Sequence, residues 1–261
     1  MKVGIIGGSG FDDFGELNVR GRLTPTTSWG EPSSPLICGA FGNTEVVFLA
    51  RHGETHGIPP HRVNYRANIA ALKEQQVSAI YAVNVVGGIN REMCPGDVVI
   101  PDQIIDYTWG REHTYSEGPC SDGPSSDDPS TDSPSVPLQH VDFTNPYDAT
   151  LKDKLLQQAI PLGLHVHAGG VYGATQGPRL ETAAEIARME RDGCDIVGMT
   201  GMPEAALARE LNIPYACLAL VVNLAAGLGD GDISMGQIQQ TIDLRMADIR
   251  RLLVAVAKNT E

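Results

Sequence analysis

Short apolar runs alternate with amphipathic stretches of helical periodicity along the chain, and this alternation limits the folds open to it. Short apolar runs are typical of buried strands, and amphipathic stretches are typical of helices that cover a sheet. Strands are predicted at Val3–Ile6, Leu36–Phe41, Glu45–Ala50, Ala79–Asn84, Asp97–Asp106, Gly169–Ala174, Ile196–Met199 and Tyr215–Asn223. Helices are predicted at Asn64–Gln76, Pro146–Leu162, Thr182–Asp192, Pro203–Leu211 and Met235–Lys258.

The alternation predicts one α/β domain over residues 1–261, with a central mixed β-sheet flanked by helices. The hairpin pattern of Leu36–Ala50 and the length of Asp97–Asp106 favour a mixed rather than a wholly parallel sheet. Residues 121–137 depart from the pattern, with six Ser, four Pro and four Asp. Such a segment buries too little apolar area to offset its ordering entropy, so we expect a flexible surface insert, with a functional lid as the alternative.

Composition narrows the classes of function. The formal charge of −13 argues against a nucleic-acid partner, which requires a basic face. No apolar run approaches the roughly 20 residues that span a bilayer, and the first apolar run is too short for a secretory signal. We therefore expect a cytoplasmic protein without a membrane partner. The five cysteines are scattered with no CxxC pair, which disfavours a disulfide framework or a zinc site.

Groups suited to binding an anion follow several predicted strands. Gly7-Gly8-Ser9-Gly10 fits neither a dinucleotide fingerprint nor a Walker loop, and either a phosphate turn or a structural glycine turn fits it. Arg51-His52 suits a phosphate clamp, although a surface cluster with Glu54 is equally compatible. His52, His56 and His61 lie on a loop broken by Gly and Pro, which is not a metal-ligand pattern.

Two more strand ends complete this set. The segment Asn84-Val85-Val86-Gly87-Gly88 contains paired glycines, which permit close approach of a ligand. A plain turn without a ligand is the alternative. Thr200 offers a hydroxyl near the start of the next helix. If these strand ends share one edge of the sheet, they form a single anion pocket. Glu181, after a Gly-Pro turn, and Asn223, after an apolar strand, are candidates to bind a base; alternatively, Asn223 caps a turn.

The chain resembles the trimeric nucleoside phosphorylase family, which contains purine nucleoside phosphorylases and methylthioadenosine phosphorylases. The resemblance covers roughly residues 2–256 except the insert. It rests on the combination of Gly7-Gly8-Ser9-Gly10, Arg51-His52-Gly53, Val63-Asn64-Tyr65-Arg66-Ala67-Asn68, Pro95-Gly96-Asp97, Gly177-Pro178-Arg179 and Met199-Thr200-Gly201-Met202-Pro203-Glu204. It implies phosphorolysis of an N-glycosidic bond by inorganic phosphate as co-substrate, with no metal or other cofactor, in a homotrimer with sites near subunit interfaces.

The resemblance also implies roles for individual residues. Those expected to bind phosphate are Ser9, Arg51, His52, Val85 through its backbone, and Thr200. Met199 is expected under the ribose, and Leu180 is expected in the base pocket, where the family usually has Phe. His140 is expected to reach the ribosyl 5′ side of a neighbouring subunit's site. Asn223, Glu181 and His52 are the expected catalytic residues.

Two departures from the family pattern concern the substrate. Adenine-type members carry aspartates where this chain has Asn223 and Ala225. An amide can donate to O6 of a 6-oxopurine and accept from N7–H, whereas an aspartate would repel O6. Glu181 can accept from N1–H, which a 6-oxopurine has and adenine lacks. We therefore expect hypoxanthine-type bases to be preferred.

The second departure lies near the start of the last helix, where ordinary purine nucleoside phosphorylases bind the 5′-hydroxyl with a histidine. Here Met235 stands there, with Ile233 and Ile238 nearby. This soft apolar group suits a 5′-methylthio substituent, unless these residues are simply helix core. Alternatives are a general inosine/guanosine phosphorylase, a methylthioadenosine phosphorylase, or a nucleoside-binding protein without activity.

Overall fold

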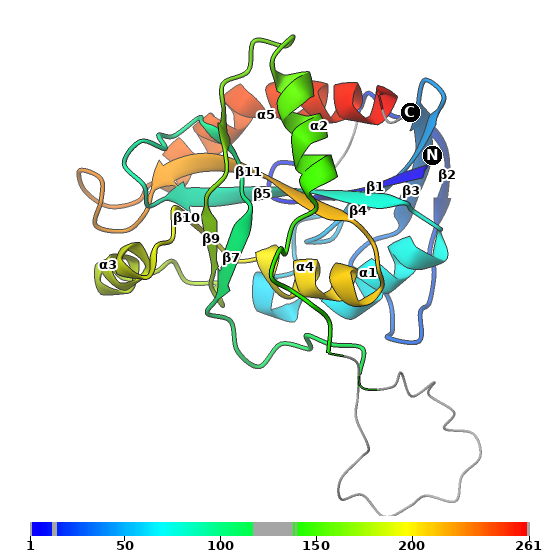
Figure 1. Ribbon diagram of the computed structural model, residues 1–261, viewed down its shortest axis with the longest axis horizontal. Helices are drawn as coiled ribbons and strands as arrows, with labels where there is room; N and C mark the ends of the chain where they lie inside the picture. Colours follow the sequence, from blue (N-terminus) through cyan, green and yellow to red (C-terminus); the bar gives the residue numbers. More distant parts are fainter. Residues whose placement is uncertain (1, 12–14, 117–137, 139, 260–261) are drawn as a thin grey trace, which may run out of the picture.

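The computed structural model describes residues 2–11, 15–116, 138 and 140–259 (Figure 1). The predicted insert at residues 121–137 lies outside the described residues. Within them, the strands join one sheet of eleven strands. The strands are β1 Lys2–Gly7, β2 Asn18–Leu23, β3 Leu36–Phe41, β4 Thr44–Ala50, β5 Ala79–Gly88, β6 Val98–Ile100, β7 Gln103–Asp106, β8 Val166–Ala168, β9 Val171–Ala174, β10 Ile196–Gly198 and β11 Tyr215–Leu224.

The sheet has a parallel centre and antiparallel additions, which confirms the predicted mixed sheet. β1 pairs in parallel with both β4 and β5, and β5 pairs in parallel with β11. β3 runs antiparallel to β2 and β4, β10 runs antiparallel to β5, and β6 runs antiparallel to β11. The carboxyl ends of β1, β4, β5 and β11 therefore point the same way, which is the arrangement that α/β proteins use to build ligand sites.

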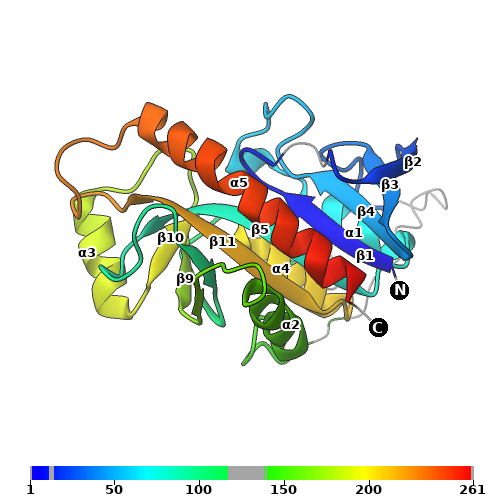
Figure 2. The ribbon, with the colours of Figure 1, turned by 90° about the horizontal axis from the view of Figure 1, so that it is seen from above.

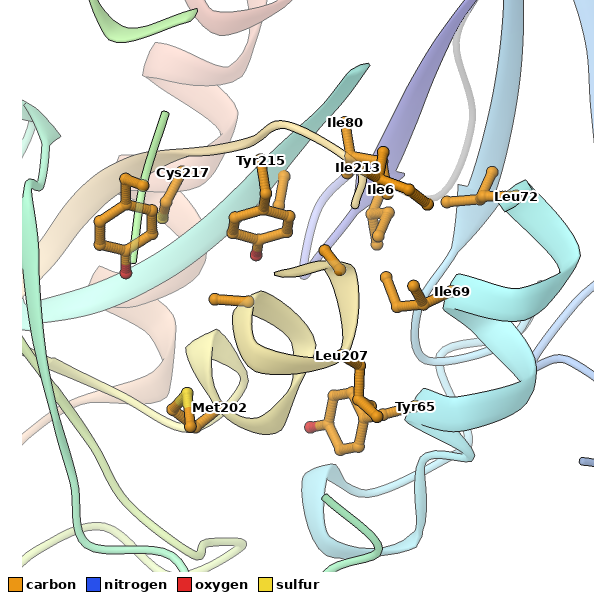
Figure 3. Close-up of a cluster of buried hydrophobic side chains, with 14 of the residues drawn as sticks. Ile6, Tyr65, Ile69, Leu72, Ile80, Met202, Leu207, Ile213, Tyr215 and Cys217 are labelled. Atoms are coloured by element: carbon orange, nitrogen blue, oxygen red, sulfur yellow. The ribbon is translucent and has the colours of Figure 1, made fainter. Parts of the chain in front are cut away.

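Helices cover both faces of the sheet (Figures 1 and 2). They are the short 3₁₀ helix η1 Pro60–Arg62, α1 Tyr65–Glu74, α2 Ala149–Ala159, α3 Ala183–Asp192, α4 Gly201–Glu210 and α5 Met235–Lys258. α1 and α4 pack on one face, where Ile69 and Leu207 belong to the same buried cluster as the sheet residue Ile80 (Figure 3). α2 and α5 pack on the other face through residues such as Leu155 and Ile249. The α/β fold class is thus confirmed.

An apolar stripe explains why α5 is held against the sheet, and its spacing in the sequence predicts it: Ile238, Ile242, Ile249, Leu252, Leu253 and Val256. Its five later members, from Ile242 to Val256, are buried, whereas Ile238 is only partly buried and lies at the cavity described below. Burying side chains of this size stabilises the fold by about 1.5–3 kcal/mol each.

Two strand predictions need correction, and two strands were missed. β5 continues to Gly88, so Asn84 and Val85 lie inside a strand instead of at its end. Asp97–Asp106 is not one strand but two, because Pro101 has no N–H to donate and separates β6 from β7. β2 and β8 were not predicted, since β2 is exposed throughout and the three residues of β8 include no buried one. None of the described helices is long and apolar enough to span a bilayer.

Candidate functional site

All but one of the predicted site residues line a single cavity of about 540 Å³. Its wall combines the end of β1, the residues after β4, the second half of β5, the ends of β10 and β11, and the first turns of α5. The predicted residues found there are Ser9, Arg51, His52, Val85, Leu180, Glu181, Met199, Thr200, Asn223, Ala225, Met235 and Ile238. The tertiary structure thus brings together residues spread over most of the chain.

Two different strand directions meet at this cavity, in contrast to the expectation of four strand ends on one edge. Parallel strands β1 and β4 deliver Ser9 and Arg51, and the backbone N–H of Arg51 donates to the carbonyl of Gly7 at 3.0 Å. Thr200 follows β10, which runs antiparallel to β5 and approaches from the other side. The amide of Asn84 donates to the Thr200 hydroxyl at 2.9 Å and so fixes its position beside β5.

Arg51 is fully buried and belongs to an ion-pair network. Its Nε and Nη2 donate to the two carboxylate oxygens of Glu204 at 2.7 and 2.8 Å. The Tyr215 hydroxyl donates to the same carboxylate at 2.7 Å. Burial by itself would lower the pKa of Arg51, but the charge of Glu204 outweighs burial and holds the pKa above its ordinary value. The alternative of a surface cluster with Glu54 is wrong.

Most N–H groups of the Arg51 guanidinium therefore donate to acceptors of the protein itself. Nη1 donates to the carbonyl of Val83 at 3.0 Å, and Nη2 donates to the Asn84 side chain at 3.2 Å. Nη1 also lies against Gly8, where an added Cβ would be 2.9 Å from it and 2.7 Å from the Val83 carbonyl oxygen. Glycine at this position therefore allows the loop that carries Ser9 to approach the arginine. Together with the two bonds to Glu204, these bonds use four of the five N–H groups. Arg51 therefore has fewer N–H groups available to bind phosphate than the sequence suggests.

His52 is held as a neutral ring. Its Nδ1 lies 2.8 Å from the carbonyl oxygen of Ile58, so Nδ1 carries the proton and donates it. Burial, together with the charge of Arg51, lowers the pKa of His52 to about 4. In this tautomer Nε2 is an acceptor. The site thus contains an imidazole suited to a ligand that brings a proton, such as a protonated phosphate oxygen.

His56 was considered only as a metal ligand from sequence, yet it also lines the cavity. Its Nε2 lies 3.2 Å from the Ser9 hydroxyl oxygen, and its ring centroid lies 4.7 Å from that of His52. The side chain therefore orients Ser9.

The pKa of His52 predicts a pH effect on stability. Because the pKa falls from 6.5 to about 4 on folding, the folded chain binds fewer protons than the unfolded chain between these values. The contribution of neutral His52 is complete above pH 6.5 and is lost as the pH falls toward 4, by on the order of 3 kcal/mol. Urea unfolding without phosphate measures the loss of stability between pH 7 and pH 4.5. This loss should be smaller for His52→Gln than for the unaltered protein. Equal losses would contradict the assignment.

Glu181 and Asn223 occupy another part of the cavity wall. Thr175, which follows β9, donates its hydroxyl proton to Oε1 of Glu181 at 2.6 Å. The other carboxylate oxygen remains able to accept from a ligand. Thr175 was not predicted, although a hydroxyl directly after an apolar strand is the same signal that identified Thr200.

Asn223 lies at an irregularity in β11. The register between β11 and β5 shifts between Val221 and Asn223, and such a bulge re-aims the following side chain. Its Nδ2 donates to the carbonyl of Leu224 at 2.7 Å, as the turn-capping alternative expects. One N–H and the oxygen of the Asn223 amide take no part in that bond, so capping the turn and binding a base are compatible.

Arg111 is a residue of this region that the sequence did not reveal. It is buried, and its guanidinium donates to backbone carbonyls on two segments: those of Thr175 and Gln176 at 3.1 and 2.8 Å, and that of Met199 at 2.8 Å. It thereby fixes the segment before Glu181 relative to the segment before Thr200. Because its main partners are backbone carbonyls, no side-chain motif in the sequence marks it.

The remaining predicted residues lie at the apolar part of the cavity or outside it. Met235 is 69% exposed and Leu180 is 42% exposed, so Met235 is not part of the helix core. Ala225 is buried, and Met199 is partly buried. His140 is exposed and does not line this cavity, so its role at a neighbouring subunit's site stays a prediction.

Comparison with known proteins agrees with this geometry. A protein of Xanthomonas campestris pv. campestris named probable S-methyl-5′-thioinosine phosphorylase is 46% identical, covering 99% of this chain and 98% of that protein. The 6-oxopurine nucleoside phosphorylase of Pyrococcus furiosus is 44% identical over 97% of this chain and 91% of its own length.

The structural comparison gives the same family. Methylthioadenosine phosphorylase from Schistosoma mansoni, solved in complex with adenine, matches with a TM-score of 0.90 and 32% identity, covering 99% of this chain and 91% of that chain. The model of the phosphorylase superfamily matches residues 2–258, nearly the whole sequence. A cavity that combines groups for an anion with groups for a base, on a chain matched end to end, establishes that this protein belongs to the phosphorylase superfamily.

Proposed function

We propose that this protein catalyses phosphorolysis of S-methyl-5′-thioinosine, giving hypoxanthine and 5-methylthioribose 1-phosphate. The observation that carries the proposal is the composition of one cavity, which holds Glu181 and Asn223 together with anion-binding groups and an apolar rim at Met235. The name of the relative from Xanthomonas campestris pv. campestris supports the same substrate. The reaction belongs to the pentosyltransferase type.

Base selection would rest on two hydrogen-bonding groups. Glu181, held by Thr175, would accept from N1–H of a 6-oxopurine. The amide of Asn223 would donate to O6 and accept from N7–H as the leaving base gains a proton. Each buried mismatch with adenine would cost about 1–3 kcal/mol. Two mismatches correspond to roughly two to four decades of discrimination.

Inorganic phosphate would be the nucleophile and a co-substrate, with no metal or other cofactor in the reaction. Ser9 and Thr200 offer hydroxyls, Val85 offers its backbone, and His52 offers Nε2 to a P–OH group. Arg51 would contribute chiefly by the position that Glu204 gives it. Holding phosphate below C1′ would remove the entropic cost of bringing it there.

Bond cleavage would precede attack. As the C1′–N9 bond stretches, positive charge would develop on the ribosyl group and negative charge on the purine. Phosphate would stabilise the positive charge on the ribosyl group. Asn223 would stabilise the negative charge on the purine, and this effect would be strongest in the transition state. Met199 would lie under the ribose, and Leu180 and Ala225 would line the base pocket.

We further propose a homotrimer in the cytoplasm, in which His140 of a neighbouring subunit approaches the ribosyl 5′ side. The exposure of His140 is consistent with this role. Nucleic acid is not proposed as a partner, given the charge of −13. Sedimentation velocity tests the trimer, and a monomer with full activity would exclude the shared site.

The deciding experiment compares four nucleosides with and without phosphate: methylthioinosine, methylthioadenosine, inosine and adenosine. Release of free purine should require phosphate, and methylthioinosine should show the highest kcat/KM. Preferred cleavage of methylthioadenosine would contradict the base assignment. A folded sample that binds methylthioinosine but releases no base would instead be a nucleoside-binding protein.

A general 6-oxopurine nucleoside phosphorylase is the second candidate, favoured by the Pyrococcus furiosus relative. Met235 separates the two activities because it offers an apolar contact where a 5′-hydroxyl would need a hydrogen bond. Met235→His should shift the kcat/KM ratio from methylthioinosine toward inosine by about tenfold, the value of one or two buried apolar groups. Equal turnover of both nucleosides by the unaltered protein would favour the second candidate.

A further inference from the structure

A cluster of metal-ligating side chains lies away from the cavity. Asp97, His165 and His167 each present one ligand atom, and these atoms lie within 4.8 Å of one another. None of the three lines the cavity. We propose that these residues form a binding site for a divalent transition-metal ion, of which Zn²⁺ fits best. The proposal does not depend on the function proposed above.

The backbone holds the three side chains together. His165 and His167 are two residues apart at the start of β8, so they project from the same face of the strand. β8 pairs in parallel with β6, with Val166 opposite Val98, which places Asp97 next to His165 in the register. The imidazole rings stand perpendicular with centroids 5.1 Å apart. A site therefore needs only side-chain rotation, without movement of the sheet.

The hydrogen bonding at the cluster resembles that of a metal site in which a proton takes the place of the ion. Nε2 of His167 lies 3.1 Å from Oδ2 of Asp97, and an imidazole N–H shared with a carboxylate occupies the position a metal would take. Oδ2 of Asp97 also accepts from the backbone N–H of Cys94 at 2.8 Å, which fixes the carboxylate on its turn. Such a supporting bond to a ligand strengthens metal affinity.

The chemistry of the three ligands selects the type of metal. Two imidazoles and one carboxylate suit Zn²⁺, whereas Mg²⁺ and Ca²⁺ prefer oxygen ligands only. Tetrahedral zinc needs ligand atoms about 3.3–3.5 Å apart, so no pair of these atoms, all within 4.8 Å of one another, has to close by more than about 1.5 Å. His165 is exposed, which leaves the fourth position to water.

The neighbouring positive charge does not oppose a cation strongly. Arg245 of α5 donates through Nε to the carbonyl of Gly96 at 2.9 Å. Its Nη1 donates to Asp248 at 2.7 Å, so its charge is paired on its own helix. A bound ion would join β8, which in the described sheet pairs only with β6, to the turn that precedes β6.

The test titrates Zn²⁺ into chelator-treated full-length protein by calorimetry, with melting temperature as a second readout. We expect about one ion per chain and a rise in melting temperature with Zn²⁺. His165→Ala and His167→Ala should each weaken binding at least tenfold and abolish the thermal shift. Without metal, both variants should keep the phosphorolysis rate of the unaltered protein, and His165→Ala should also keep its melting temperature.

Two controls identify the site. His113→Ala removes another exposed imidazole and should leave Zn²⁺ binding unchanged. Asp97→Asn keeps an acceptor for the Cys94 N–H but removes the charge, and it should also weaken binding. Zn²⁺ affinity that is unchanged in His165→Ala and His167→Ala would place any bound ion elsewhere, for example at His52 and His56, and would overturn the proposal.

Discussion

Asn223→Ala is expected to lower kcat/KM for methylthioinosine by about 10- to 1,000-fold, the usual effect of removing one group that stabilises transition-state charge. The loss should appear mainly in kcat, because the amide bonds most strongly to a base that is gaining negative charge. The bond from Nδ2 to the Leu224 carbonyl shows that the side chain also braces its turn. Thermal unfolding should therefore be recorded for the same sample.

Asn223→Asp separates recognition of the base from support of the turn. This variant keeps the size of the side chain but replaces an N–H donor with a charge that repels O6 of a 6-oxopurine. We expect activity on methylthioinosine to fall and relative activity on methylthioadenosine to rise, with Ala225→Asp added if the single change is insufficient. If neither variant alters kcat/KM or base preference, Asn223 has no part in the reaction.

Glu204→Gln is expected to destabilise the protein by about 3–5 kcal/mol, because it leaves the buried charge of Arg51 uncompensated. Both side chains are fully buried, and the carboxylate accepts two bonds from Arg51 and one from Tyr215. Urea unfolding at one fixed chain concentration measures the effect. The KM for phosphate should also rise, since Arg51 holds its position beside Gly8 through this pair.

The exposed ion pair between Arg22 and Glu54 provides the matched control. Its N–O distance is 2.6 Å, close to the 2.7 Å of the buried pair, but both side chains are about half exposed. Glu54→Gln should change stability by less than about 1 kcal/mol, because water screens the charges. The double variant Arg51→Met with Glu204→Met should recover part of the stability without recovering phosphate binding. Equal effects of the two Glu→Gln changes would contradict the burial argument.

The sequence predicted much of the fold because strand and helix patterns are local. The stripe on α5 was recognisable from spacing alone, and its later members are buried. β2 was missed because its side chains are exposed throughout and form no apolar pattern. β5 was cut short at Asn84 because a polar residue in a strand looks like an end, although this amide is buried and paired with Thr200.

At the candidate site, too, the sequence identified some residues and missed others. Ser9, Arg51, Glu181, Thr200 and Asn223 were identified from sequence as polar groups after apolar runs or in motifs of the resembled family, and all line the cavity. The partnership of Arg51 with Glu204 was not predicted, because Glu204 lies 153 positions along the chain. Arg111 was missed altogether, since its partners are carbonyls that every residue carries.

By itself, the sequence determined the order of strands and helices and the side chains available for chemistry, because these follow from local periodicity and residue type. Only the tertiary structure decided which groups meet: an antiparallel β10 brings Thr200 to Asn84, and Glu204 accepts two hydrogen bonds from Arg51. The physical reason is that strand pairing and burial join residues far apart in the chain. Charge, protonation and orientation at the site depend on those distant neighbours.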